Sequence, residues 1–350
     1  RTNAELPTIE SLLDFSKVVM GDLLAPAGGS GTEVRVACLN GFECCVKIMD
    51  CSQYGQDLVD GMEKEISLLL MLKSCKQIVQ YLHHDKSGHL LRLYMELFPS
   101  SLRKTIKSRA ESATPFTAQQ VYVLARKILK ALRFLHTQPQ PIVHRDIKTD
   151  NVLVEEDLSG NFLRVKLTDF GSAKILTRGR TSSIDQGTSG YQAPEMVRSD
   201  FSSAIGNGIS SAASHSSNTG NENSGQLSYT TAVDIFSFGI TLYEILALQK
   251  VYPQCASRQE LEEALRNAEK YPPDFQLVPR QLLNFLLIVS PCLKRNYTER
   301  PTASELIVEL DKLAIGMGLK KQQSLPPPSS FKSRPKNTVN SSSVAASTKF

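Results

Sequence analysis

The sequence lacks the hallmarks of a membrane or secreted protein. None of its apolar runs reaches the ~18 residues needed to cross a bilayer. No secretory leader stands at its start, and residue 1 is Arg rather than Met. We therefore expect a segment of a longer cytoplasmic protein, without a transmembrane segment.

Paired cysteine motifs are missing as well. No CxxC pair occurs, and the seven cysteines are an odd number. The six histidines do not cluster with cysteines at the spacing of zinc ligands. These absences favour a reducing compartment over a disulfide framework and argue against a zinc site. The cysteines are Cys38, Cys44, Cys45, Cys51, Cys75, Cys255 and Cys292.

Acidic residues are absent from residues 319–350. The net charge of the whole chain is +5, and it falls to about −1 when the six basic residues of this stretch are left out. The remaining body is therefore not a basic surface for nucleic acid. The six basic residues are Lys320, Lys321, Lys332, Arg334, Lys336 and Lys349.

Two segments contain too few large apolar residues to build a core. Residues 199–228 are rich in Ser, Gly and Asn, and the tail of residues 314–350 becomes basic and rich in Pro and Ser from Lys320 onward. Such compositions cannot offset the entropy of ordering, so we expect a disordered insert and a disordered tail. The tail is a candidate linker or partner-binding segment, with SH3 binding and anionic membrane contact as weaker alternatives.

The rest of the chain changes character near residue 97. Residues 34–38 and 42–49 are β-type and meet at Asn40-Gly41, a hairpin turn signal. A helix is expected over 61–73 and two strands within 78–97. The later segments are helical, so a small β-rich lobe precedes a larger helical one. The expected helices are 101–112, 118–137, 231–249, 280–293 and 302–313.

Three ordered motifs lie within the helical lobe. They read "IVHRDIKTDNVLV" (142–154), "VKLTDFGSAK" (165–174) and "GTSGYQAPEM" (187–196). Together they resemble the eukaryotic protein kinase family over about residues 15–313, although each alone would be weak. The resemblance implies a bilobal α+β fold. A flank of residues 1–14 would precede a β-rich N-lobe of residues 15–97 and a larger α-helical C-lobe of residues 98–313.

The chemistry of phosphoryl transfer gives roles to these polar residues. The protein must position the reactants and neutralise charge. Asp169 and Asn151 offer the carboxylate and amide oxygens that suit the Mg²⁺ (or Mn²⁺) of bound ATP. Asp146, five residues before Asn151, is expected to orient the substrate hydroxyl and take its proton. Lys148, two residues further along, can reach the transferring phosphoryl group.

One lysine, Lys47, interrupts the apolar run of residues 42–49. Such a strand would not bury Lys47 without an anion. In the family this lysine contacts the α and β phosphates and pairs with a glutamate on the following helix. Glu65 is the best match for that glutamate. Glu63 is the alternative, and two residues along a helix point in different directions.

By the same resemblance, adenine binds at the junction of the lobes. Met95 would be the gatekeeper, and the backbone of Glu96 and Leu97 would hydrogen-bond the base. Cys45 occupies a position where Ala is usual, and its simplest interpretation is a small buried hydrophobe. The residues expected to sandwich the base are Val34, Cys45 and Leu153.

Other motif residues match the structural positions of the family. Asp234 should brace the backbone of the catalytic loop. Arg300 should pair with Glu195 at the base of the large lobe. The remaining matched positions are His144, Phe170 and Gly171.

Two residues favour Ser/Thr over Tyr as the phosphate acceptor. Lys148 is characteristic of Ser/Thr kinases, and Thr188 resembles the threonine that hydrogen-bonds the catalytic Asp and Lys in those enzymes. The motifs look closest to the tyrosine-kinase-like group, with leucine-rich-repeat or Roco-type kinases as the suggested neighbours.

Regulation by phosphorylation is expected from Arg145, which precedes the catalytic Asp. Kinases with this Arg often gain activity when a phosphate on the activation segment neutralises it. The candidate sites are Thr177, Thr181, Ser182 and Ser183.

The glycine cluster at 28–31 fits the G-x-G-x-x-G-x-V pattern of the family poorly. If Val34 covers adenine, the three glycine positions become Ala27, Gly29 and Thr32, and Gly28 and Gly31 add backbone freedom. In the other register, Gly28 and Gly31 take the second and third positions and Pro26 the first. The first register is preferred. This irregular loop supports the alternative of a pseudokinase scaffold. A small-molecule phosphotransferase is disfavoured by the Ala193-Pro194-Glu195 motif.

Overall fold

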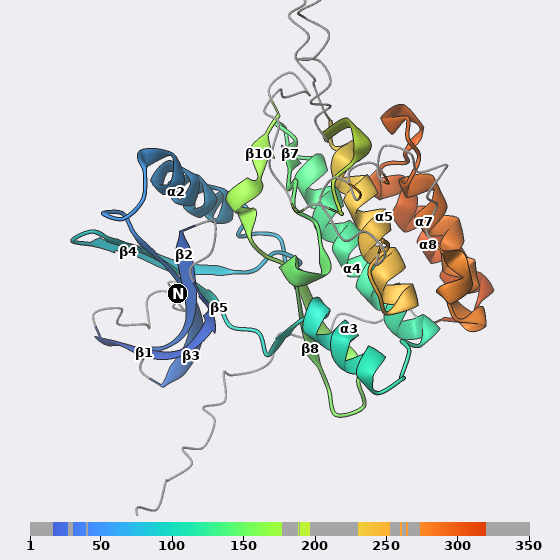
Figure 1. The fold of residues 1–350 in the computed structure, drawn as a ribbon, viewed down its shortest axis with the longest axis horizontal. Helices are drawn as coiled ribbons and strands as arrows, with labels where there is room; N and C mark the ends of the chain where they lie inside the picture. Colours follow the sequence, from blue (N-terminus) through green and yellow to red (C-terminus); the bar gives the residue numbers. More distant parts are fainter. Residues whose placement is uncertain are drawn as a thin grey trace, which may run out of the picture.

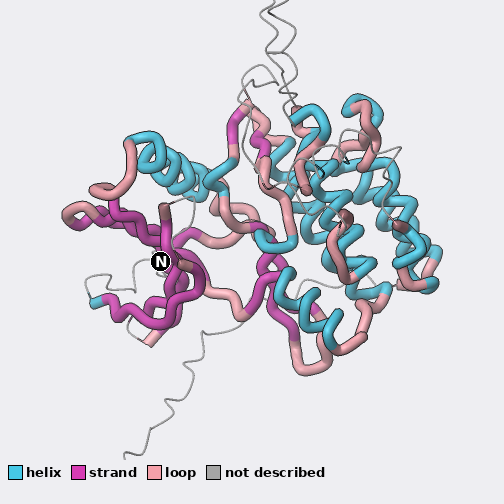
Figure 2. Tube along the Cα trace, in the orientation of Figure 1, coloured by secondary structure: helices cyan, strands magenta, loops and turns pink. Residues whose placement is uncertain are grey.

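The fold was analysed in a computed structural model of the chain. It describes residues 17–26, 31–39, 41–176, 188, 190–196, 230–252, 260, 264 and 274–319. Figure 1 shows a sheet with one helix beside a larger group of helices, and Figure 2 shows the same division between strand and helix. The expected N-terminal flank, the polar insert 199–228 and the basic part of the tail lie outside the described residues.

The smaller lobe, called the N-lobe below, is an antiparallel sheet of five strands in the order β1-β2-β3-β5-β4. Strands β2 and β3 form the expected hairpin, in which Leu39 lies opposite Phe42. The strands are β1 (Val18–Ala25), β2 (Thr32–Leu39), β3 (Phe42–Asp50), β4 (Tyr81–Ser87) and β5 (Leu90–Glu96).

Helix α2 (Gln56–Met71) connects β3 to the rest of the sheet. It begins five residues before the expected start at Gly61. Gly61 lies inside the helix, and the space where a side chain would be is open. One face of α2 is buried through Val59, Met62, Ile66 and Leu69. That face packs into the main core, so α2 is held against the sheet by its apolar stripe.

The two faces of the N-lobe sheet carry different kinds of residue. Ala37, Leu39, Cys44, Val46 and Tyr94 form a separate hydrophobic cluster. Residues alternate between faces along a strand, so Lys47 on β3 points to the opposite side from Val46. The sheet thus gives one face to its own cluster and the other to Lys47.

The larger lobe, called the C-lobe below, contains the three-stranded sheet β6-β8-β9 and most of the helices. Helix α5 is the most deeply placed, because each residue from Val233 to Leu246 is buried. A Cβ on Gly239 would lie 2.7 Å from the Cβ of Cys292, so a glycine lets α5 and α7 approach closely. The helices are α3 (Leu102–Glu111), α4 (Ala118–His136), α5 (Ala232–Ala247), α7 (Leu286–Cys292) and α8 (Ala303–Gly316). The strands are β6 (Ser100–Ser101), β7 (Ile142–Val143), β8 (Val152–Glu156), β9 (Phe162–Leu167) and β10 (Lys174–Ile175).

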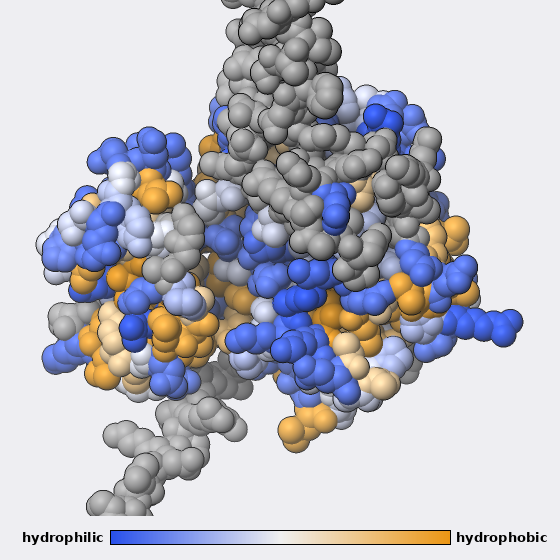
Figure 3. Space-filling model, in the orientation of Figure 1, coloured by the Kyte–Doolittle hydropathy of each residue, from blue (hydrophilic) through white to orange (hydrophobic). Residues whose placement is uncertain are grey.

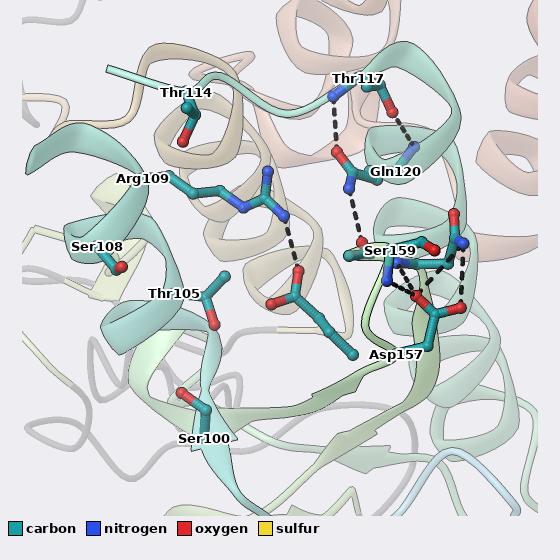
Figure 4. A network of polar contacts seen from close by, with 12 residues as sticks. Ser100, Thr105, Ser108, Arg109, Thr114, Thr117, Gln120, Asp157 and Ser159 are labelled. Carbon is teal, nitrogen blue, oxygen red and sulfur yellow. Dashed lines mark hydrogen bonds and ion pairs between the residues drawn. The ribbon is translucent and has the colours of Figure 1, made fainter. Parts of the chain in front are cut away.

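Hydrogen bonds brace the β8–β9 hairpin against α3 and α4 (Figure 4). Arg109 of α3 pairs with Glu156 at 2.8 Å, and the Gln120 side chain donates to the carbonyl of Gly160 at 2.7 Å. Gln120 also completes a capping box with Thr117 at the start of α4. The hairpin that leads into the second motif is therefore fixed to the helices of the C-lobe.

The single helix expected over 280–293 is divided. Residues Arg280–Phe285 form a 3₁₀ helix, and α7 begins at Leu286. Pro291 lies inside α7 and has no backbone N–H to donate, and the helix ends at Cys292. Among the described residues, no helix combines the length and apolar character needed to cross a membrane.

Candidate active site

The catalytic loop runs from β7 to β8 and is anchored to α5. The carboxylate of Asp234 accepts hydrogen bonds from the backbone N–H of His144 and Arg145, each at 2.9 Å. His136 of α4 contacts the same carboxylate at 2.9 Å. Burial alone would raise the pKa of Asp234, but the His136 bond and the His144 amide lower it below its usual value. Asp234 therefore remains a charged anchor for the loop.

Asp146 lies at the centre of a dense group of donors. Its carboxylate accepts from Lys148 Nζ at 2.6 Å, from Asn151 Nδ2 at 2.9 Å and from Thr188 Oγ1 at 2.8 Å. Lys148 Nζ also reaches Thr188 Oγ1 at 2.5 Å. The expected catalytic residues of the C-lobe thus meet around one buried carboxylate, and Thr188 joins them from a distant part of the chain.

Asp169 and Phe170 form the turn after β9. Asp169 has a left-handed backbone (φ 61°), a conformation that L-residues rarely adopt and that functional sites often contain. The ring of Phe170 packs on His144, with 4.8 Å between centroids. His144 in turn contacts the carbonyl of Thr168 at 3.1 Å. The catalytic loop and the Asp169 turn are therefore locked to each other.

Lys47 joins the two lobes electrostatically. Its Nζ lies 2.7 Å from Glu65 Oε2 on α2 and 3.2 Å from Asp169 Oδ1. Burial disfavours the charge of Lys47, but the two carboxylates outweigh it and raise its pKa. Burial raises the pKa of Glu65 despite the ammonium beside it. For Asp169, whose side chain is 44% exposed, burial opposes the charge but Lys47 lowers the pKa.

The structure distinguishes the two candidate partners of Lys47. Glu65 is 2% exposed and also accepts a hydrogen bond from the backbone N–H of Phe170 at 3.2 Å. Glu63 is exposed, and its nearest ion-pair partner is Lys86 at 3.9 Å. Gly171 follows the turn, and a Cβ there would approach Glu65 Oε2 to 3.6 Å.

A divalent cation fits the oxygens of Asn151 and Asp169. The amide nitrogen of Asn151 is committed to Asp146, which leaves its oxygen as the acceptor. A backbone bond from Thr168 N to Asn151 O, at 3.0 Å, holds the two segments together. In the described part of the chain, no three His, Cys, Asp or Glu side chains form a metal cluster. Two protein ligands suit a cation such as Mg²⁺ that is also held by phosphates and water.

The residues expected around adenine lie on strands of both sheets. Val34 on β2 lies directly opposite Lys47 on β3, so both side chains project from the same face of the sheet. Cys45 lies opposite Met95 on β5, and Leu153 lies on β8. Glu96 ends β5, and Leu97 follows it. In Figure 3 the surface is indented between the two lobes.

Only part of the glycine cluster can be placed, because Gly28 and Gly29 lie outside the described residues. Gly31 has a left-handed backbone (φ 67°), and a Cβ there would lie 2.9 Å from the Tyr54 ring. Glycine at this position is therefore required by both backbone conformation and packing.

The base of the C-lobe contains the expected pair of Arg300 and Glu195. Two nitrogens of Arg300 contact the two carboxylate oxygens at 2.6 and 2.9 Å. The Arg300 side chain is fully buried. This bidentate pair connects the end of the activation segment to the segment before α8.

Arg145 has a left-handed backbone (φ 66°) and is 6% exposed. Its Nε donates to the carbonyl of Ser172 at 2.5 Å, so it already faces the start of the activation segment. The candidate phosphorylation sites Thr177, Thr181, Ser182 and Ser183 lie outside the described residues.

Two groups of functional interest were missed by sequence reasoning. Glu244 of α5 is 2% exposed and accepts from Tyr191 at 2.7 Å and Thr149 at 3.0 Å. Burial raises its pKa. The second group surrounds the side chain of Glu96 and contains Arg164 and Lys166. A charged residue in an apolar helix such as α5 was the available signal for Glu244.

Comparison with known proteins identifies the family. The family model described as "Protein kinase domain" matches residues 27–309. A Dictyostelium discoideum protein named "Kinase and exchange factor for Rac B" is 31% identical over 84% of this chain and 24% of its own length. The Arabidopsis thaliana "Mitogen-activated protein kinase kinase kinase 3" is 31% identical over 86% of this chain and 46% of its length. The Drosophila melanogaster "Putative mitogen-activated protein kinase kinase kinase 7-like" is 29% identical over 74% and 57%.

The chain belongs to the protein kinase family, which confirms the family and the bilobal α+β fold expected from the motifs. It spans between about a quarter and somewhat more than half of the length of these relatives. The relatives named as kinase kinase kinases agree with a placement near the tyrosine-kinase-like group. The suggested Roco-type neighbours stay a prediction.

Proposed function

We propose that this chain transfers the γ-phosphoryl group of Mg-ATP to Ser or Thr hydroxyls of protein substrates. The observation that carries the proposal is the group around Asp146, in which Lys148, Asn151 and Thr188 all contact one carboxylate. A solvated polar loop would have no reason to bury these groups together at 7% exposure for Asp146.

Each residue has a distinct task in this reaction. The carboxylate of Asp146 orients the substrate hydroxyl and accepts its proton. Lys148 supplies positive charge beside that carboxylate, where the transferred phosphoryl group gathers negative charge. Lys47 holds the phosphates of ATP, and its pairing with Glu65 fixes the position of its ammonium.

Asn151 and Asp169 would hold the metal ion. Mg²⁺, or Mn²⁺ in its place, supplies charge neutralisation to the phosphates when it is bound. Asp169 has a left-handed backbone, and Lys47 lies 3.2 Å from its carboxylate and lowers its pKa.

The preference for Ser and Thr rests on Thr188. Its hydroxyl bridges Asp146 and Lys148, which is the contact that the resemblance to Ser/Thr kinases predicts for this threonine. Relatives from plants are named as serine/threonine kinases, which supports the same substrate class. We also place the protein in the cytoplasm, with protein substrates as its partners and no nucleic acid.

The experiment is phosphoryl transfer from labelled Mg-ATP to a mixture of generic protein substrates. Asp146→Asn and Asp169→Asn are each expected to lower turnover by about a thousandfold, since each removes a charge that acts in the transition state. Glu156→Gln serves as the matched control, because Glu156 lies in the same lobe and forms an ion pair with Arg109, away from Asp146.

A pseudokinase gives a different result. The irregular glycine cluster is the feature that favours this second function. A wild-type chain that binds nucleotide but transfers no phosphate in any divalent metal would contradict the proposed enzyme and support the scaffold.

A further inference from the structure

The side chain of Glu96 makes contacts that its place in the hinge, the junction of the lobes at residues 95–97, does not explain. Its Oε1 accepts a hydrogen bond from the backbone N–H of Gln80 at 2.7 Å and contacts Lys166 Nζ. Its Oε2 lies 3.0 Å from a guanidinium nitrogen of Arg164. The backbone N–H of Glu96 also donates to the carbonyl of Gln80 at 3.0 Å. One carboxylate therefore receives three donors.

These donors come from both lobes. Gln80 lies just before β4 in the N-lobe, whereas Arg164 and Lys166 lie on β9 in the C-lobe. The same two segments also pair through their backbones. Val79 N donates to Leu167 O, and Leu167 N donates to Gln77 O, each at 2.8 Å. Glu96 thus adds an ionic link beside the only backbone pairing that the described residues show between β9 and the N-lobe.

The contact between Glu96 and Lys166 is too well enclosed to be an ordinary surface ion pair, whereas Arg164 is 31% exposed. The side chains of Glu96 and Lys166 are each 10% exposed. The guanidinium of Arg164 lies 4.2 Å from the centre of the Phe98 ring and also contacts Glu155. Loss of one partner from such a group leaves the other charges desolvated and unpaired, whereas loss of both partners costs much less.

The group also borders the expected nucleotide site. Lys166 lies directly opposite Leu153, one of the residues expected to contact adenine. β9 ends at Leu167, and Asp169 follows two residues later. A change in the angle between the lobes at Glu96 would therefore move the hinge, the adenine site and the Asp169 turn together.

We propose that Glu96 is a positioning residue whose carboxylate clasps the two lobes and thereby limits how fast nucleotide leaves. Glu96, Lys166, Arg164 and the Gln80 amide are called the lobe clasp below. The inference rests on the proposed function, because it assumes that nucleotide binds between the lobes. Opening of the lobes requires the contacts of Glu96 to β9 to break, so the clasp sets the barrier to nucleotide exchange.

The test is the dissociation rate of a fluorescent ADP with Mg²⁺, measured by stopped flow on the whole chain. Glu96→Gln keeps the backbone and the size of the side chain but removes its charge. We expect dissociation to accelerate about tenfold. Amide hydrogen exchange at Val79 and Leu167 should accelerate in parallel, because their backbone bonds lose the adjacent ionic link.

Two further variants separate a clasp from a merely structural residue. Glu156→Gln breaks a more exposed ion pair on the same hairpin, and that pair stays within the C-lobe. It should leave dissociation unchanged. The double variant Glu96→Gln/Lys166→Gln removes both charges, so its melting temperature should recover relative to Glu96→Gln while ADP dissociation stays fast.

The outcomes decide the proposal. In the double variant, both the ADP dissociation rate and the melting temperature could return to wild-type values. That result would mean that Glu96 acts only through folding. An unchanged rate in Glu96→Gln would overturn the clasp outright. If Glu96→Gln does not fold, the double variant gives the rate instead. If the wild type binds no nucleotide, the proposed function fails, and unchanged exchange at Val79 and Leu167 would refute the clasp separately.

Discussion

Two buried carboxylates, Asp234 in the C-lobe and Glu65 in the N-lobe, hold the two halves of the site by opposite means. Asp234 is 0% exposed and accepts two backbone N–H bonds and a His136 contact, and its pKa is lowered. Glu65 is 2% exposed, and burial raises its pKa in spite of Lys47. The two pKa shifts differ in direction because Asp234 accepts hydrogen bonds from backbone N–H groups of its own lobe.

Glu65 depends instead on a contact that spans separate elements. Lys47 comes from β3, Glu65 from α2 and the neighbouring Asp169 from the other lobe. The C-lobe half of the site is thus built by the fold of that lobe alone. The N-lobe half is complete only when α2 lies against the sheet and the lobes are close.

Replacement of Asp234 tests the more rigid half and should have the largest effect. Asp234→Asn leaves one of the two loop amides without an acceptor, so we expect the free energy of unfolding at pH 7 to fall by about 2 kcal/mol. The folded pKa of Asp234 lies below its unfolded value of roughly 4. Its contribution is therefore complete above that value and is lost as the pH falls below it.

Denaturant unfolding of wild type and Asp234→Asn between pH 3 and 7 measures this contribution. The difference in stability should be largest at pH 7 and shrink below about pH 4. A difference that stays constant with pH would show that the charge of Asp234 is not what anchors the loop.

Replacement of Glu65 tests the half that depends on lobe position. Glu65→Gln keeps a hydrogen-bond acceptor near Lys47, and Asp169 still lies 3.2 Å from that lysine. We expect kcat/KM for ATP to fall by about tenfold, with less loss of stability than in Asp234→Asn.

Glu63→Gln is the matched control on the same helix, because Glu63 is exposed and 3.9 Å from Lys86. Steady-state kinetics should give this variant the wild-type kcat/KM for ATP. Equal losses in the Glu63 and Glu65 variants would remove the distinction drawn between them.

The smallest effect concerns regulation at Arg145. We infer that a phosphate on the activation segment pairs with Arg145, whose guanidinium already faces Ser172. Replacing Thr181, Ser182 and Ser183 together by Ala should lower turnover a few-fold. Mass spectrometry must first show that the wild-type protein carries phosphate there. Full activity of the triple variant alongside a phosphorylated wild type would contradict this inference.

The sequence predicted the elements that depend on local pattern. The β2–β3 hairpin and the helix α4 follow their turn signal and apolar periodicity closely. The start of α2 was misjudged because Gly61 weakens a helix without ending it. The division of residues 280–293 was missed because its apolar pattern fits either helical form.

The resemblance predicted the site residues that lie in the family's motifs, including pairs such as Lys47–Glu65 and Arg300–Glu195 that join distant segments. The motifs carry no information about His136, which reaches Asp234 from a helix far away in the sequence. The same holds for Lys166, which lies within the second motif and was given no role there. Such partners are selected by packing between elements, which spacing along the chain does not encode.

The surroundings of Cys45 have a consequence for inhibitor chemistry. This thiol lies on the same strand as Lys47, within the expected nucleotide site, and is partly exposed. Burial raises its pKa to about 12, although Lys47 opposes the shift. Covalent inhibitors attack through the thiolate, and very little thiolate is present at neutral pH. A warhead directed at Cys45 would therefore depend on binding affinity and orientation rather than on the reactivity of the cysteine.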